Sequence, residues 1–120
     1  MKKAFAAGSF TLLILLLPAG CRSAFVAATI TNNSGSQVTL VEVDYPYASF
    51  GVGALAPGAQ FHYRFKLLGD GPVKIQFTDA AGKLHTASGP ALQEGQDGQL
   101  QINIGPSGKI SWIPRLTKIR

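Results

Sequence analysis

Hydrophobic and polar residues alternate along several short stretches of this chain. In residues 60–66 three aromatic side chains fall on one side and the polar side chains on the other. Residues 73–78 and 99–104 repeat this alternation. A two-residue period is typical of a strand with one face on a core and the other in water. Further alternating runs, at 26–31, 41–45, 83–87 and 110–112, extend the pattern along the chain.

Turn-forming residues separate these runs. Asn32–Gly35, Pro57–Gly58, Asp79–Gly82 and Gly105–Gly108 carry the glycines and prolines that short hairpin loops use. About seven short strands at near-regular spacing predict an all-β fold, an antiparallel β-sandwich over residues 25–113. The strand count and rhythm resemble the immunoglobulin-like and fibronectin-like modules of bacterial envelope proteins. A small β-barrel is the alternative architecture.

Two segments interrupt the rhythm. The first, Tyr45–Gly53, contains Pro46, which cannot donate to a strand ladder, so we expect the second strand to end or to reach a sheet edge there. The second, Ser88–Gly98, combines Pro90 with three glycines and predicts a long loop.

The N-terminus has the layout of a secretory signal peptide. Two lysines precede an apolar stretch, Ala4–Leu17, and small residues follow it. The alternative is a transmembrane helix, which needs about 20 apolar residues. This run is shorter, and Pro18 would break a helix near its end. The sequence therefore favours a signal peptide over residues 1–20.

The single cysteine of the chain follows this segment directly. Leu17-Pro18-Ala19-Gly20-Cys21 resembles the lipobox of bacterial lipoproteins, although Pro18 stands where the family usually has Leu. The resemblance implies a diacylglyceryl thioether on Cys21, cleavage before it and acylation of the new amino group. Several acyl chains on one residue give firm anchoring. The alternative role for Cys21 is a buried structural thiol.

The resemblance also implies a location. Residues 21–24 would be the lipidated anchor and a short spacer, at the membrane of a bacterial cell envelope. In Gram-negative lipoproteins Asp after the cysteine retains the protein at the inner membrane. Arg22 stands there instead, which implies the periplasmic face of the outer membrane.

Charge gives little indication of nucleic-acid binding. The formal net charge is +5, but Lys2 and Lys3 would leave with the signal peptide. From Cys21 to Ile113, basic and acidic residues are equal in number. The remaining surplus lies in residues 114–120, which we expect to form a solvated basic tail. Nucleic-acid binding requires a clustered basic face, so no nucleic-acid partner is expected.

Candidate reactive groups are few. His62 and His85, the only histidines, fall on the polar faces of their predicted strands. A metal site would require both to meet a third ligand such as Asp79. No zinc spacing, calcium loop, phosphate loop or nucleophile elbow occurs. We therefore expect no catalysis, no cofactor and no metal.

One aromatic segment is a candidate binding surface. Tyr45, Tyr47 and Phe50 could form a platform for a sugar ring or a partner chain. Packing over the open edge of the core is the alternative, and Trp112 is expected in the core. The sequence thus predicts a lipid-anchored envelope protein with a non-catalytic interaction or structural module and an envelope protein partner. A small-ligand or carbohydrate binder is the alternative, and a metal carrier or enzyme using His62 and His85 is a further one.

Overall fold

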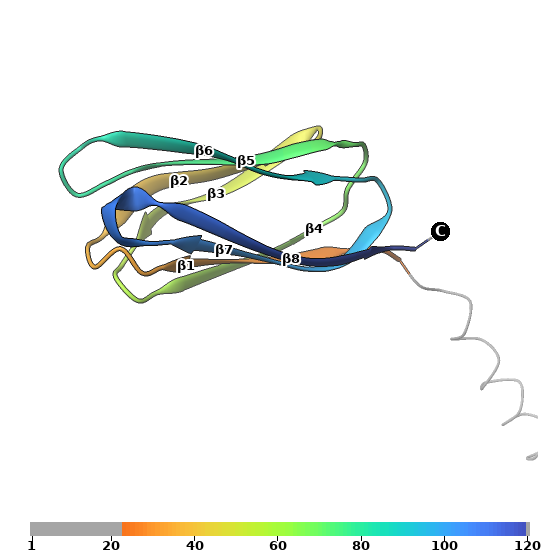
Figure 1. Ribbon diagram of the computed structural model, residues 1–120, viewed down its shortest axis with the longest axis horizontal. Coiled ribbons are helices and arrows are strands. Elements are labelled where there is room, and N and C mark those ends of the chain that lie inside the picture. The colour runs from red at the N-terminus through yellow and green to blue at the C-terminus, as the bar shows by residue number, and fades with distance from the viewer. Residues whose placement is uncertain (1–22, 120) are drawn as a thin grey trace, which may run out of the picture.

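The computed structural model describes residues 23–119. These residues form eight strands in two four-stranded sheets that pack face to face (Figure 1). The sandwich prediction is confirmed, and the two sheets do not close into a barrel. The strands are β1 (Val26–Asn32), β2 (Val38–Tyr45), β3 (Ala48–Leu55), β4 (Gln60–Phe65), β5 (Gly71–Thr78), β6 (Leu84–Leu92), β7 (Gln96–Ile104) and β8 (Ile110–Lys118).

One sheet has the order β4-β1-β7-β8 and the other β3-β2-β5-β6. All neighbouring pairs are antiparallel except β1 and β7, which pair in parallel from Val26 opposite Gly98 to Asn32 opposite Ile104. Four strands therefore lie at sheet edges, namely β3, β4, β6 and β8. The arrangement places the start of β1 and the end of β8 at the same end of the sandwich (Figure 1).

The core lies between the sheets and is built from the alternating strands. In β1, Val26, Ala28 and Ile30 are buried, while Ala27 is exposed and Thr29 is half-buried. The inward side chains of β2, β5 and β7 follow the same period. The other fully buried large side chains are Leu67, Phe77, Leu92, Leu100, Ile102, Ile104, Val38, Val43, Val73 and Ile75. Burying this apolar surface drives the two sheets together.

Three boundaries differ from the sequence-based expectation. The segment 88–98 is not a long loop, because β6 runs to Leu92 and β7 begins at Gln96. The irregular segment after Tyr45 contains a full strand, β3. Residues 114–118 continue β8, whose Pro114 lies opposite Leu100. Proline is tolerated there because β8 is an edge strand.

The predicted signal peptide and Cys21 lie outside the described residues. Among residues 23–119, no helix is long and apolar enough to cross a membrane.

Candidate functional site

The three aromatic residues of the predicted platform do not share one exposed surface. Phe50 is only 6% exposed and belongs to the core. Tyr45 is half-buried and packs against that core. Tyr47, in contrast, is 83% exposed. The side chains of Tyr45 and Phe50 thus pack over the open side of the sandwich, and only Tyr47 is presented to solvent.

An aromatic cluster closes the side of the sandwich between β3 and β4. Phe50 stacks on Tyr63 with ring centroids 4.5 Å apart and an interplanar angle of 14°. Tyr45 stacks on Phe65 at 4.1 Å and 29°. Phe61 completes the cluster at 6.3 Å from Phe50. Burial raises the pKa of the Tyr45 hydroxyl, and the nearby Tyr63 adds to this effect. These aromatic rings pack between the edges of the two sheets and extend the core, so they do not form an exposed platform on which a ligand could stack.

Tyr47 stands at the tip of the β2–β3 hairpin. Pro46 and Tyr47 form the two-residue turn between Tyr45 and Ala48, which pair directly. Tyr47 has φ 74°, the left-handed conformation that the second central residue of a type II turn requires and that glycine normally supplies. A bulky side chain is unfavourable in this conformation. Local strain of this kind concentrates at functional sites, which makes Tyr47 a candidate contact residue.

The four sheet edges differ in how well they are protected against pairing with other chains. Charged residues and proline discourage such pairing. β8 carries Pro114 and two basic residues, β6 carries Pro90, and the short β4 carries Arg64. The sequence of β3, ASFGVGAL, has eight residues without a charge or a proline. β3 therefore presents an unprotected edge.

Small residues on β3 leave a shallow hollow on the outer face of this sheet. Gly51 and Gly53 are exposed on β3, and Leu40 of β2 stands next to them at 67% exposure. Together they line a shallow hollow on this sheet. Leu40 has φ 52° and lies where the β2–β5 register shifts by one residue, which is the signature of a β-bulge. The sequence pattern does not reveal this region, because glycines have no side chain that could contribute to a hydrophobic period.

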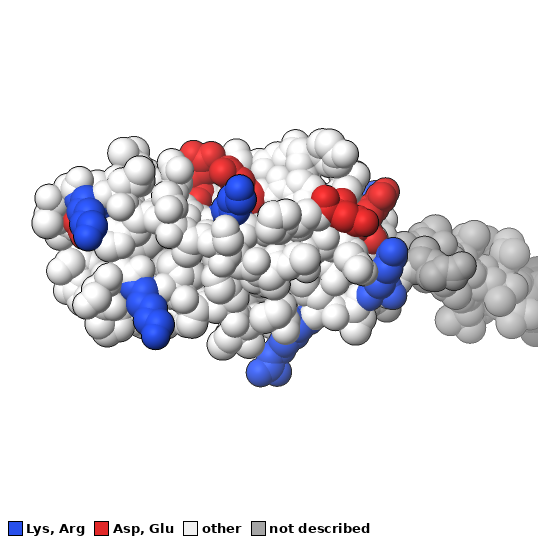
Figure 2. All heavy atoms as spheres, turned by 45° about the horizontal axis from the view of Figure 1, so that its top comes forward, with Lys and Arg blue, Asp and Glu red and all other residues white. Residues whose placement is uncertain are grey.

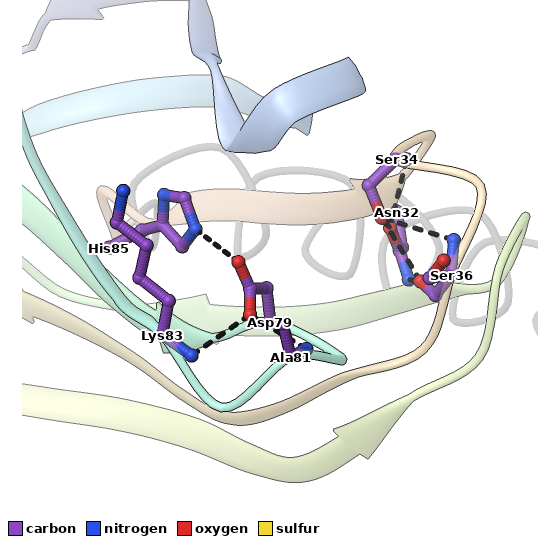
Figure 3. Close-up of polar contacts among 7 residues, drawn as sticks. All are labelled: Asn32, Ser34, Ser36, Asp79, Ala81, Lys83 and His85. Atoms are coloured by element: carbon purple, nitrogen blue, oxygen red, sulfur yellow. Dashed lines mark hydrogen bonds and ion pairs between the residues drawn. The ribbon is translucent and has the colours of Figure 1, made fainter.

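The two histidines lie on different sheets and in separate environments. The Nδ1 atom of His62, on β4, is 3.0 Å from the hydroxyl of Thr29. The Nε2 atom of His85, on β6, is 2.8 Å from Oδ2 of Asp79 (Figure 3). The ring of His85 stacks on Phe77 at 4.8 Å, nearly parallel. Among residues 23–119, no three His, Cys, Asp or Glu side chains are placed to hold a metal ion.

Asp79 organises the β5–β6 hairpin loop. Its Oδ1 accepts hydrogen bonds from the backbone amides of Ala81 and Lys83, both at 2.9 Å, and its Oδ2 faces His85 (Figure 3). The hydrogen bond from His85, followed by that from the Lys83 amide, lowers the pKa of the Asp79 carboxyl. This geometry is that of an Asx turn with a neighbouring histidine. The contacts of Asp79 and His85 therefore stabilise the hairpin loop.

Asn32 is the one buried polar residue of the described core. Its amide nitrogen donates to the carbonyls of Ser36 at 2.7 Å and Leu55 at 2.9 Å. Its amide oxygen accepts from the backbone N–H and the hydroxyl of Ser34 (Figure 3). Because every polar atom has a partner, Asn32 ties the β1–β2 loop to the end of β3. Its role is structural.

Charged side chains are dispersed over one face of the described sandwich (Figure 2). On the face shown in Figure 2, Lys and Arg side chains stand apart from one another rather than forming a continuous basic patch. Acidic side chains lie among them on the same face. A nucleic-acid-binding surface would require basic residues clustered on one face.

Comparisons with known proteins give a fold relationship. No protein-family model and no curated protein matches this chain. Among solved structures, the chain is similar to a protein from Eubacterium rectale determined by NMR, with a TM-score of 0.56 and 11% sequence identity. The similarity covers 78% of this chain and 93% of the Eubacterium protein. At this level of identity, the similarity is one of fold alone.

Proposed function

We propose that this chain is a lipid-anchored protein of the bacterial cell envelope whose β-sandwich is a non-catalytic interaction module. The observation that carries the proposal is the position of the sandwich along the chain. β1 begins at Val26, five residues after the cysteine of the lipobox-like motif. The folded part therefore begins where the mature lipoprotein would begin, with no room for another domain between them.

The short connection limits how far the sandwich can stand from its anchor. From Cys21 to Val26 the backbone reaches at most about 18 Å, since an extended chain advances about 3.6 Å per residue. Such a module acts close to the membrane surface. This geometry suits a subunit of an envelope assembly better than a long-reach adhesin. Arg22 favours the periplasmic face of the outer membrane as the site.

The unprotected β3 edge is the surface on which we expect an envelope partner. An extended segment of another protein could add to the sheet beside β3 through main-chain hydrogen bonds. Two-fold pairing of two β3 edges would be antiparallel and would place the two N-terminal ends at opposite ends of the joined sheet. Two copies anchored in one membrane surface cannot pair in this way. This argument excludes two-fold pairing of two β3 edges, and we expect the partner to be a strand of a different protein.

The anchor is tested by metabolic labelling with radioactive palmitate. The wild-type protein should incorporate label, and the matched Cys21→Ser variant should not. An unlabelled wild-type protein would contradict the proposed anchor.

The interaction surface is tested by site-specific photocrosslinking in intact cells. A photoreactive amino acid at Ala54 on β3 is compared with one at Ala91 on β6, an exposed alanine on another edge strand. We expect an adduct from position 54 and none from position 91. A Gly53→Lys substitution should abolish the adduct, because a charge at this edge opposes strand addition and a side chain there meets open space. Equal adducts from both positions, or none, would refute the β3 edge as the interaction surface.

A further inference from the structure

The end of the sandwich at which the chain enters carries two exposed apolar side chains. Tyr47 is 83% exposed and Leu68, in the β4–β5 connection, is 61% exposed. A Cβ atom on Gly69 would overlap the ring of Tyr47, so this ring lies against the backbone of the residue after Leu68. Tyr47 and the backbone next to Leu68 are therefore neighbours at this end of the sandwich, and we call the two exposed side chains, Tyr47 and Leu68, the entry-end patch.

Hydrogen bonds join three segments at this end of the sandwich. The backbone N–H of Glu94 donates to Asp70 Oδ1 at 2.8 Å, which links the β6–β7 loop to the β4–β5 connection. The N–H of Ile119 donates to the carbonyl of Gly95 at 3.1 Å, which ties the end of β8 to the same loop. The connection that carries Leu68 is thus tied to the β6–β7 loop and, through it, to the end of β8.

The incoming chain is also fixed at this end. The Phe25 N–H donates to Asp97 Oδ1 at 3.1 Å, and the Phe25 carbonyl accepts from the Gly98 N–H at 3.0 Å. The guanidinium of Arg64 lies 4.2 Å from the centre of the Phe25 ring. Only residues 22–24 therefore separate Cys21 from a position that is bonded to the sandwich. A lipid on Cys21 would bring this end, and not the opposite one, to the bilayer.

We propose that the entry-end patch rests on the lipid surface, with Tyr47 and Leu68 in the interfacial region of the bilayer. This inference rests on the proposed anchor at Cys21. Tyrosine suits such a site because it combines an apolar ring with a hydroxyl that remains in water. The patch has mixed charge around it, with Lys66 and Asp70 both exposed, so its contact is with apolar lipid rather than with anionic headgroups. The strained turn at Tyr47 holds the ring outward for this contact.

The orientation also assigns the opposite end. The β5–β6 hairpin, with Asp79 and His85, lies at the far end of the sandwich from the incoming chain (Figure 1). Leu84 lies at this far end because it pairs with Thr78, the last residue of β5. Leu84 is 58% exposed, almost the same as Leu68. Leu68 and Leu84 are thus two leucines of similar exposure at opposite ends of the sandwich.

The test compares these leucines in the full-length lipidated protein. Trp112, the single tryptophan, is replaced by Phe, and either Leu68→Trp or Leu84→Trp is added. Each variant is extracted from membranes, its lipidation is checked by intact mass, and it is reconstituted in phosphatidylcholine vesicles with and without phosphatidylglycerol. Quenching of its fluorescence by brominated acyl chains is then measured.

We expect the Leu68→Trp variant to lose most of its fluorescence in both vesicle types and the Leu84→Trp variant to lose almost none. Equal quenching of two lipidated variants would overturn the orientation while leaving the anchor in place. An unlipidated Cys21 would overturn the anchor and the orientation together. Amide hydrogen exchange on the natural sequence gives a second readout that needs no substitution. Bound to vesicles, residues 67–70 should exchange more slowly than in detergent and residues 80–82 should be unchanged, and the absence of this difference would also overturn the orientation.

Discussion

The replacement of Phe50 by alanine tests whether the aromatic segment is core or binding surface. Phe50 is 6% exposed and its ring stacks on Tyr63 at 4.5 Å. Truncating a buried phenylalanine costs about 3–5 kcal/mol, which includes the cavity that remains. Tyr47 is 83% exposed, so Tyr47→Ala removes little buried surface and should change the stability by less than about 0.5 kcal/mol.

Urea unfolding followed through the fluorescence of Trp112 measures both variants. With a denaturant slope of about 2 kcal/mol per molar, the loss expected for Phe50→Ala lowers the unfolding midpoint by about 2 M. The midpoint of Tyr47→Ala should stay close to that of the wild type. A Phe50→Ala variant that loses less than about 1 kcal/mol would refute the assignment of Phe50 to the core. So would equal losses in the two variants.

Three further substitutions test particular features. Tyr47→Gly should stabilise the protein by about 0.5–1 kcal/mol in urea unfolding, because glycine adopts positive φ without the steric cost; a loss of stability would show that the turn is unstrained. The pKa of Asp79 is lowered in the folded protein, so its carboxylate stabilises the fold above its usual pKa, and this stabilisation is lost as pH falls through the folded pKa. The difference in unfolding free energy between wild type and Asp79→Asn should therefore be present at about pH 7 and should disappear below about pH 4. A difference in stability between wild type and Asp79→Asn that persists in acid would refute a stabilising role of the hydrogen bond from His85 to the Asp79 carboxylate. Gly98→Ala should cost at least about 2 kcal/mol, since Gly98 has φ 138° and a Cβ there would overlap a β8 carbonyl, whereas the control Gly53→Ala, in open space, should cost nothing measurable.

The fold class could be predicted because its signal is local. Alternation in residues 60–65, 73–78 and 99–104 reports which side chains face the core, and the structure has strands at all three places. The turns between these strands are marked by glycine and proline for stereochemical reasons that hold in any fold.

The parts of the fold that the pattern missed, namely β3 and the later halves of β6 and β8, lack such local signals. β3 contains Gly51 and Gly53, which have no side chain to show which face is buried. β6 and β8 contain Pro90 and Pro114, which argue against a central strand but are compatible with an edge. Whether a strand is central or at an edge depends on residues far away in the sequence. The parallel pairing of β1 with β7 joins segments about seventy residues apart, and no short pattern encodes it.

For the candidate site too, some features can be predicted from a contiguous sequence signal and others depend on the three-dimensional fold. The lipobox-like motif is a contiguous signal and was available from the sequence. The contrast between Phe50 and Tyr47, three residues apart, depends on the two-residue turn at Pro46, which sends one ring inward and the other outward. The entry-end patch required the three-dimensional arrangement, because the Tyr47 ring lies against Gly69, the residue after Leu68, only through the packing of separate loops.

The intact mass of the protein extracted from its own membrane tests the proposed lipid anchor at Cys21 most directly. We expect a polypeptide that begins at Cys21 and carries the added mass of a diacylglyceryl group and an amide-linked acyl chain. A protein that keeps residues 1–20 and an unmodified thiol, with the 12.6 kDa mass of the whole chain, would contradict it.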